Sequence, residues 1–438
     1  MTTGTHAGFS GAPGRRDAPT LPDGVRIPAP AGHATALHEG RLSVDVVAPS
    51  PTSDLSLRTS STSTSTTASP TGAHVDLGRM VVLNEWFESI GGAERTLLAM
   101  LDAFPGAEGY ALWKDAGAQA PAHLRESWLA RTPLRGRKAL TLPLMPFVWR
   151  TQTRRRYDVV LSLSHSLNHT ARFPLNPGGA HLSYVHTPAR YVHLPEIDRR
   201  RRAGLQSLAV GVTKQIERRT SRHVDSYAAN SVEVQQRIRE FWGRDARVVN
   251  PPVRTGFFTP DDAPTPVCDR GYLLGVGRWI LYKRFDTMID VAARSGLPLV
   301  LAGAGPMEGE LRERAAASGV PVAFEVRPTD ERVRELMRGA KALLFPCHED
   351  FGIVPVEAQA CGTPVVGLGR GGLAETVVDG RTGALVDEID VTALADAVRR
   401  VDRLDPLDMR ANALRFGSDR FAAQVQQWVH DVQAGDRF

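Results

Sequence analysis

With 438 residues and 42% hydrophobic residues, the chain is long enough for two domains with sizeable cores. No apolar run approaches the ~20 residues that cross a bilayer, and the N-terminal MTTGTHAGFSG lacks the apolar core of a secretory signal. Cys268, Cys347 and Cys361 are spaced too widely for a metal-ligand pair or a disulfide framework. We therefore expect reduced thiols and a cytoplasmic protein.

The net charge of +5 includes two arginine clusters, Arg154 to Arg156 and Arg199 to Arg202. A solvated arginine face explains such clusters most simply, and contact with an anionic membrane surface is the next reading. No aromatic interleaving or nucleic-acid motif accompanies the clusters, so we do not expect a nucleic-acid partner.

In chain order, residues 1–76 are rich in Ser, Thr and Pro, and residues 59–69 are nearly pure Ser and Thr. Such a segment cannot bury enough apolar surface to offset its chain entropy, so we expect a disordered N-terminal extension.

From residue 77 the pattern changes to alternating strands and helices. Strands are predicted at 80–84, 158–163, 181–186 and 225–229, with helices at 93–103 and 232–241. Apolar strands alternating with helices are typical of a parallel, doubly wound sheet. We assign 77–250 to one Rossmann-like domain.

The stiff Asn250-Pro251-Pro252 segment separates this domain from a second series of strands and helices. Strands are predicted at 272–276, 297–302, 320–326, 342–345 and 364–367, and helices at 284–295, 306–318 and 330–339. We assign 251–415 to a second Rossmann-like domain and 416–438 to a helix that packs back toward the first. Ligands of such sheets bind at the carboxyl ends of the strands, so we expect a site in a cleft between two facing domains.

Two loops of the second domain follow strands and open helices. Arg278 and Lys283, in Gly277-Arg278-Trp279-Ile280-Leu281-Tyr282-Lys283, are two cations that can clamp a diphosphate. The turn Gly303-Ala304-Gly305-Pro306 is either a tight structural turn or a ligand contact.

The block from Glu349 to Glu357 carries two carboxylates around a Phe351-Gly352 turn and a helix start. Backbone amides of residues 351–354 suit phosphate or sugar oxygens. Glu357, in the first helical turn, is expected to stay ionised and to accept hydroxyls. The two acids are not at helical spacing, so they are not predicted to be an acid/base pair.

These segments, taken in order, resemble the retaining nucleotide-sugar glycosyltransferases of family 4, which have the two-domain GT-B fold. The resemblance runs from about residue 80 to the C-terminus. It rests on the Glu349 to Glu357 block, the Gly277 to Lys283 segment and the Gly303 turn, and on the later Gly371-Gly372-Leu373-Ala374-Glu375.

The resemblance assigns roles to these residues. Arg278 and Lys283 would hold the donor diphosphate, and Gly91-Gly92 would approach it from the first domain. Glu357 would bind the ribose. Glu349 would hold the donor sugar together with the backbone from Phe351 and Gly352 to Ile353 and Val354.

Within the first domain, Tyr184-Val185-His186-Thr187-Pro188-Ala189-Arg190-Tyr191 resembles a block of a bacterial mannosyltransferase-like subgroup. His186 would face the reacting centre, where it hydrogen-bonds the donor sugar or helps to take the acceptor proton. Arg190 and His165 are predicted acceptor-binding residues.

The resemblance thus implies transfer of a hexose with retention, by a front-face mechanism in which the leaving phosphate helps to deprotonate the acceptor. Neither a cofactor nor a metal is expected, because the cationic clamp stabilises the leaving group. GDP-mannose is the favoured donor, and UDP- or dTDP-linked sugars are alternatives. The expected acceptor is a lipid-linked sugar or a growing surface polysaccharide at the inner face of the membrane. A sugar-nucleotide epimerase, a phosphorylase or a non-catalytic nucleotide-sugar-binding protein are the other readings.

Overall fold

The computed structural model describes residues 78–88, 91–193 and 205–436, and it describes only the backbone at 139, 190, 191, 205–210 and 212. The predicted N-terminal extension and the cluster Arg199 to Arg202 lie outside the described residues. The described residues all belong to one compact unit. None of the described helices is both long and apolar enough to span a membrane.

The first half is built on a parallel sheet, which has seven strands among the described residues, in the order β3-β2-β1-β4-β5-β6-β7. The strands are β1 (Met80–Asn84), β2 (Glu108–Ala111), β3 (Leu124–Glu126), β4 (Tyr157–Ser164), β5 (Leu175–Val185), β6 (Ser226–Ala229) and β7 (Arg247–Val248). The predicted apolar strands therefore form the centre of the sheet. The sequence prediction missed β2, β3 and β7, which are short and partly charged.

Helices cover both faces of this sheet. They are α1 (Gly92–Ala103), α2 (Lys138–Thr141), α3 (Met145–Thr151), α4 (Arg190–His193), α5 (Leu205–Thr220) and α6 (Val232–Trp242). Pro143 and Pro146 each stand at the start of a new helical turn, which divides residues 138–151 into short pieces.

The second half contains a parallel sheet of six strands among the described residues, in the order β10-β9-β8-β11-β12-β13. The strands are β8 (Leu273–Arg278), β9 (Leu299–Ala304), β10 (Val322–Val326), β11 (Ala342–Phe345), β12 (Val365–Leu368) and β13 (Gly383–Val386). One face packs on α9 (Asp330–Gly339), α10 (Ile353–Ala360) and α13 (Pro406–Ala413). The other packs on α7 (Phe285–Ser295), α8 (Glu308–Ala317) and α12 (Val391–Arg400). The predicted architecture of two parallel-sheet, Rossmann-like domains is thus confirmed.

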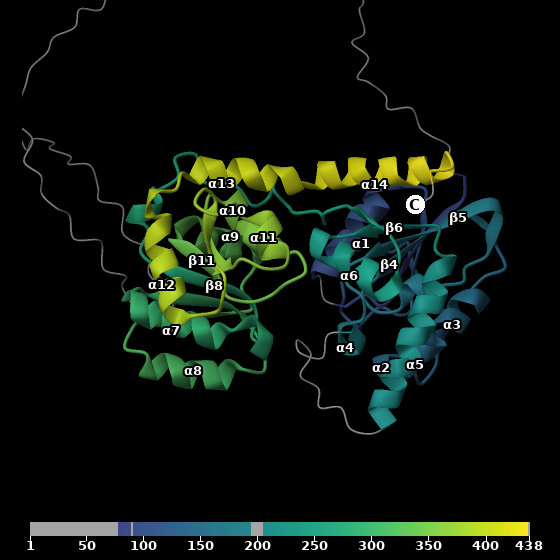
Figure 1. Cartoon of the computed structure of the whole chain (residues 1–438), viewed down its shortest axis with the longest axis horizontal. Coiled ribbons are helices and arrows are strands. Elements are labelled where there is room, and N and C mark those ends of the chain that lie inside the picture. The colour runs from purple at the N-terminus through teal and green to yellow at the C-terminus, as the bar shows by residue number, and fades with distance from the viewer. Residues whose placement is uncertain (1–77, 89–90, 194–204, 437–438) are drawn as a thin grey trace, which may run out of the picture. The chain divides into compact units, whose positions relative to one another are not determined.

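The last helix, α14 (Ser418–Gln433), packs on the sheet of the first half, near α1 and β6 (Figure 1). Its buried face contributes Phe421, Val425, Trp428, Val429 and Val432 to the core of that half. The indole Nε1 of Trp428 donates a hydrogen bond to Ser226 Oγ at 2.9 Å. The chain therefore returns to complete the domain in which it began.

Candidate active site

A pocket of about 420 Å³ lies where the N-termini of two helices converge. Gly91 and Gly92 line it at the start of α1, and Ile353 and Val354 line it at the start of α10. The approach is so close that a Cβ at position 92 would lie 2.9 Å from Ile353 Cδ1. The first amides of a helix lack intrahelical acceptors and carry the positive end of its dipole. The pocket is therefore suited to an anionic ligand.

The pocket brings together predicted donor-site residues that are distant in sequence. From the predicted set it is lined by Gly91, Gly92, Arg278, Ile353, Val354 and Glu357. The other predicted residues whose side chains are described lie outside its lining: Lys283, Glu349, Phe351, Gly352, His165 and His186.

Two exposed arginines stand on the pocket wall. Arg278 is the last residue of β8, whereas the sequence predicts that this strand ends at residue 276 and that Arg278 lies in the loop that follows. Arg327 was not predicted; its φ of 49° lies in the left-handed region, and its amide donates a hydrogen bond to Gly303 O at 2.8 Å. Both guanidinium groups are available to a diphosphate. Among the described residues, no group of three or more His, Cys, Asp or Glu side chains is placed to hold a metal ion.

Lys283 and Glu349 form a direct ion pair. Lys283 lies in the short 3-10 turn after β8, Glu349 lies in the loop after β11, and both side chains are mostly buried. Burial alone would lower the pKa of the Lys283 ammonium, but the charge and hydrogen bond of Glu349, together with the charges of Cys347 and Tyr282, outweigh burial and the pKa is raised. The lysine therefore stays protonated at neutral pH. A cation held in this way is positioned to stabilise negative charge without reorganising.

Glu357 differs from its prediction in two respects. It lies in the second turn of α10, because the helix begins at Ile353. Burial raises the pKa of its carboxyl to about 7, although the charges of Arg95 and Arg254 oppose that shift. Glu357 is therefore only partly ionised at pH 7, and not fully ionised as the helix end led us to expect, since desolvation outweighs a helix dipole that fades within the first turn.

Arg95 is a pocket residue that the sequence did not single out. Its Nη1 lies 2.9 Å from Glu357 Oε1, and its Nη2 lies 3.4 Å from Asp330 Oδ1. Arg95 comes four residues after Gly91 on α1, so its proximity to the glycine pair could have indicated that it lies at the same site. Its acidic partners are more than 200 residues away, and no local pattern could identify them.

His186 follows β5 directly, at the carboxyl edge of the first sheet. Burial lowers the pKa of its imidazole to about 3, and the charge of Asp350 only partly opposes the shift. So weak a base is neutral at physiological pH. This favours hydrogen bonding to a ligand over removal of the acceptor proton.

The remaining predicted residues occupy different environments. His165 follows β4 and lies beside His186, with 6.2 Å between the ring centroids. Phe351 is buried and packs edge-to-face on Phe416, so only its backbone can serve a ligand. Arg190 begins α4, and its side chain lies outside what the structure describes.

Polar contacts also join the two halves beside the site. The carboxylate of Glu375, from the Gly-Gly-Leu-Ala-Glu segment, accepts the amides of Val232 and Glu233 at 2.8 and 3.0 Å. It thereby satisfies free amides at the start of α6. Arg237 on the same helix pairs with Asp350, next to Glu349. Glu375, from the second half, therefore caps the N-terminus of α6 in the first half.

Comparison with known families matches both halves of the chain. Residues 90–257 match the model described as Glycosyltransferase Family 4, and residues 263–414 match the model described as Glycosyl transferases group 1. The chain thus carries the two domains of a GT-B glycosyltransferase. It belongs to the family 4 glycosyltransferases.

Two curated relatives share this family. The D-inositol 3-phosphate glycosyltransferase of Mycolicibacterium smegmatis is 36% identical over 203 residues, 43% of this chain and 45% of the relative. That of Acidothermus cellulolyticus is 38% identical over 194 residues, 39% of this chain and 42% of the relative. The chain thus spans less than half the length of either of these two relatives.

Solved structures agree on the fold. Sucrose-phosphate synthase from Thermosynechococcus elongatus has a TM-score of 0.62 at 20% identity, covering 82% of this chain and 100% of that one. HepE from Anabaena, in complex with UDP and glucose, has a TM-score of 0.58 at 17% identity, covering 80% and 99%. At this identity the likeness shows the fold alone.

Proposed function

We propose that this protein transfers a hexose, with retention, from a nucleotide diphosphate sugar to a hydroxyl of its acceptor. The observation that carries the proposal is the convergence of two helix N-termini with Arg278 and Glu357 in one pocket. The helix ends and the arginine suit a diphosphate, and Glu357 suits ribose hydroxyls. The Lys283–Glu349 pair would extend this site toward the donor sugar.

The mechanism that fits these residues is front-face transfer. The acceptor hydroxyl attacks the anomeric carbon on the side from which the diphosphate leaves, and a leaving phosphate oxygen takes the hydroxyl proton. The low pKa of His186 supports the phosphate, and not the imidazole, as the base. Arg278 and Lys283 would stabilise the departing charge, so we expect transfer to persist in the presence of EDTA.

For the donor we favour GDP-mannose, because the Tyr184 to Tyr191 block resembles a mannosyltransferase-like subgroup. UDP-glucose is the principal alternative, since HepE has a similar fold and was solved with UDP and glucose. For the acceptor we propose a lipid-linked sugar or growing surface polysaccharide. D-inositol 3-phosphate is the alternative that the names of the curated relatives suggest.

A thermal-shift panel of GDP, UDP and dTDP with their sugars tests the donor site. We expect the melting temperature to rise most with GDP-mannose, because a ligand at 100 times its Kd stabilises the native state by about 2.7 kcal/mol. Radiolabelled transfer to lipid extract or to D-inositol 3-phosphate, with and without EDTA, then tests the reaction. A chain that none of these nucleotides stabilises would refute the proposed function.

An exposed apolar surface on the first half supports the proposed lipid-linked acceptor. Leu140, Leu144 and Phe147 recur at helical spacing along residues 138–151 and are 54%, 39% and 59% exposed. Trp128, also exposed, packs its ring on Phe147 at 6.3 Å. We call these four residues the apolar stripe. Exposed basic residues flank it in sequence, namely Arg131, Arg137, Arg150 and Arg154.

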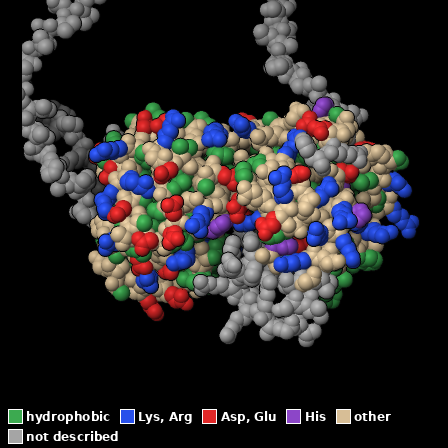
Figure 2. All heavy atoms as spheres, viewed as in Figure 1, with side chains coloured by type: hydrophobic (Ala, Val, Ile, Leu, Met, Phe, Trp, Pro, Cys, Tyr) green, Lys and Arg blue, Asp and Glu red, His purple; other side chains and the backbone are tan. Residues whose placement is uncertain are grey.

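This combination suits an interface with anionic lipid. Figure 2 shows Lys and Arg side chains prominent over the first half, whereas acidic side chains are more frequent over the second. Leu140 of the stripe lies two residues after Lys138, whose ammonium lies 4.5 Å from the ring centre of Trp86 and pairs with Glu88. Trp86 in turn contacts His165, so Lys138 connects the stripe to a predicted acceptor residue.

We expect sedimentation with phosphatidylglycerol vesicles, and little sedimentation with phosphatidylcholine. The double variant Leu144→Ser/Phe147→Ser should weaken vesicle binding by at least ~10-fold, because each large apolar side chain contributes about 1.5–3 kcal/mol on burial. Leu407→Ser/Leu414→Ser is the matched control, since these leucines are equally exposed but lie in the second half. Equal binding by both double variants would refute the assignment of this surface.

A further inference from the structure

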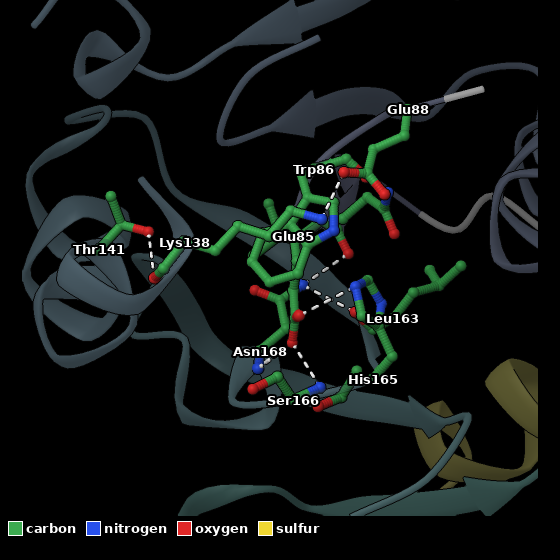
Figure 3. Close-up of polar contacts among 12 residues, drawn as sticks. Glu85, Trp86, Glu88, Lys138, Thr141, Leu163, His165, Ser166 and Asn168 are labelled. Carbon is green, nitrogen blue, oxygen red and sulfur yellow. Dashed lines mark hydrogen bonds and ion pairs between the residues drawn. The ribbon is translucent and has the colours of Figure 1, made fainter. Parts of the chain in front are cut away.

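Glu85 is a fully buried carboxylate that the proposed mechanism does not use. It follows β1 directly, at the carboxyl edge of the first sheet. Its Oε1 accepts the amides of Ser166 at 2.9 Å and Asn168 at 3.0 Å (Figure 3). These two bonds hold the loop after β4 and fix the direction of the carboxylate. Its second oxygen is therefore aimed at one place.

That place is the imidazole of His165. Glu85 Oε2 lies 3.1 Å from His165 Nε2, a close approach that is not aligned as a hydrogen bond, so Oε2 has no hydrogen-bond partner among the described residues. The ring stands edge-on to Trp86 with centroids 5.0 Å apart (Figure 3). A carboxylate oxygen accepts, so the proton of a neutral imidazole belongs on Nε2. His165 Nδ1 is then an acceptor. It is buried, and among the described residues it has no hydrogen-bond partner.

A second imidazole nitrogen without a partner lies close by. His186 Nε2 is also buried and has no partner among the described residues, and the two rings are 6.2 Å apart on the ends of adjacent strands. A buried polar atom without a hydrogen bond costs about 1–3 kcal/mol. Two such atoms side by side point to a ligand that supplies hydroxyl groups.

The two histidines are not equivalent with respect to the donor. Thr187, next to His186, accepts a hydrogen bond from Arg237, which pairs with Asp350 beside Glu349, so His186 lies toward the proposed donor-sugar side. His165 follows β4, on the opposite side of β5 from β6, and contacts Trp86, on which Lys138 packs. The hydroxyl that reaches His165 therefore comes from the acceptor.

We propose that Glu85 is a positioning residue that holds His165 with Nε2 protonated, so that Nδ1 accepts a hydrogen bond from a hydroxyl of the polyhydroxylated acceptor. This inference rests on the proposed function. Glu85 itself touches neither substrate. It acts by deciding which nitrogen of His165 faces the ligand as an acceptor.

The variant Glu85→Gln tests this role with little change of shape. The glutamine oxygen can still accept the two backbone amides, while its NH2 group donates to Nε2 and moves the imidazole proton to Nδ1. We expect the acceptor KM to rise about 10- to 100-fold, as for loss of a buried hydrogen bond, with the donor KM unchanged. The tautomer change should be visible in long-range 1H–15N spectra of histidine-labelled protein.

Glu217→Gln is the matched control, because Glu217 forms another buried glutamate–histidine pair, with His193 at 2.6 Å. It should leave the His165 tautomer and the acceptor KM as in the wild type. A Glu85→Gln protein with wild-type tautomer or wild-type acceptor KM overturns the proposal. A loss confined to melting temperature or to kcat also overturns it, since a structural role would produce that result.

The spectra separate this inference from the proposed function. D-inositol 3-phosphate and methyl α-mannoside are titrated without any donor, and we expect one of them to shift His165 Nδ1 in the wild type but not in Glu85→Gln. A wild-type protein that shows this shift but transfers no sugar would contradict only the proposed function. Absence of any shift with both probes would overturn the role of His165 and Glu85.

Discussion

Replacing Lys283 by methionine is expected to slow sugar transfer by about 100- to 1,000-fold, the range found when a fixed electrostatic group is removed from an active site. The methionine keeps the length and the apolar stem of the side chain and removes only the charge. The departing diphosphate would lose a cation that Glu349 holds in place. Single-turnover transfer rates measure the effect, because they report chemistry and not product release.

Loss of Lys283 also leaves Glu349 mostly buried without its partner, and breaking such a pair costs about 3–5 kcal/mol. The double variant Lys283→Met/Glu349→Gln removes both charges and should recover much of the melting temperature without recovering transfer. Lys341→Met is the matched control, since Lys341 is a buried lysine paired with Asp402 in the same half. Wild-type transfer by the double variant would show that the pair is only structural.

Replacing Arg95 by methionine is expected to make donor binding strongly pH-dependent around neutrality. Glu357 must be ionised to accept ribose hydroxyls, and the pKa of its carboxyl is already raised to about 7 by burial. In the wild type, donor affinity should therefore increase as the pH rises through 7. Arg95 lowers that pKa, so its removal shifts the midpoint upward. We expect a loss of about 10-fold or more at pH 7.5, because a charge-assisted hydrogen bond contributes about 1.5–3 kcal/mol, and a smaller loss at pH 9.

Two further variants test the direction of this shift. Asp330→Asn removes a negative charge that raises the pKa of Glu357, so its midpoint should move to lower pH. Arg254 and Cys361 are the other titratable groups that face Glu357, and both are left intact. Glu357→Gln should bind weakly at every pH. Isothermal titration from pH 6 to 9 measures all four proteins, and a flat wild-type profile would contradict ionisation of Glu357 as the determinant.

The central strands of both sheets were predictable because they are buried on both faces and therefore form continuous apolar runs. Residues 80–84 and 342–345 are examples, and both became strands in the centre of a sheet. The missed strands β3 and β7 are edge strands of two or three residues that carry charged side chains. Charged side chains and a short length keep an edge strand from pairing with other chains. They also leave the strand without the run of apolar residues from which a strand is predicted.

The candidate site was predictable only where several of its residues lie close together in one short segment of the sequence. The glycine pair at 91 and 92 and the start of α10 were visible as motifs, and the structure places them in one pocket. The contacts of Glu85 and Arg95 connect residues 81 and 262 positions apart, which no local pattern reveals. Nor did the sequence reveal the burial of Glu357, and its raised pKa follows from that burial.

The return of α14 to the first half has a consequence for recombining such enzymes. Exchange of the second domain between relatives, with a single junction near residue 250, would also exchange the helix that fills one face of the first domain. Trp428 and the other buried side chains of α14 would then meet a foreign sheet. A functional chimera therefore requires two junctions, one near residue 250 and one near Gly417, so that the inserted cassette ends before α14 begins.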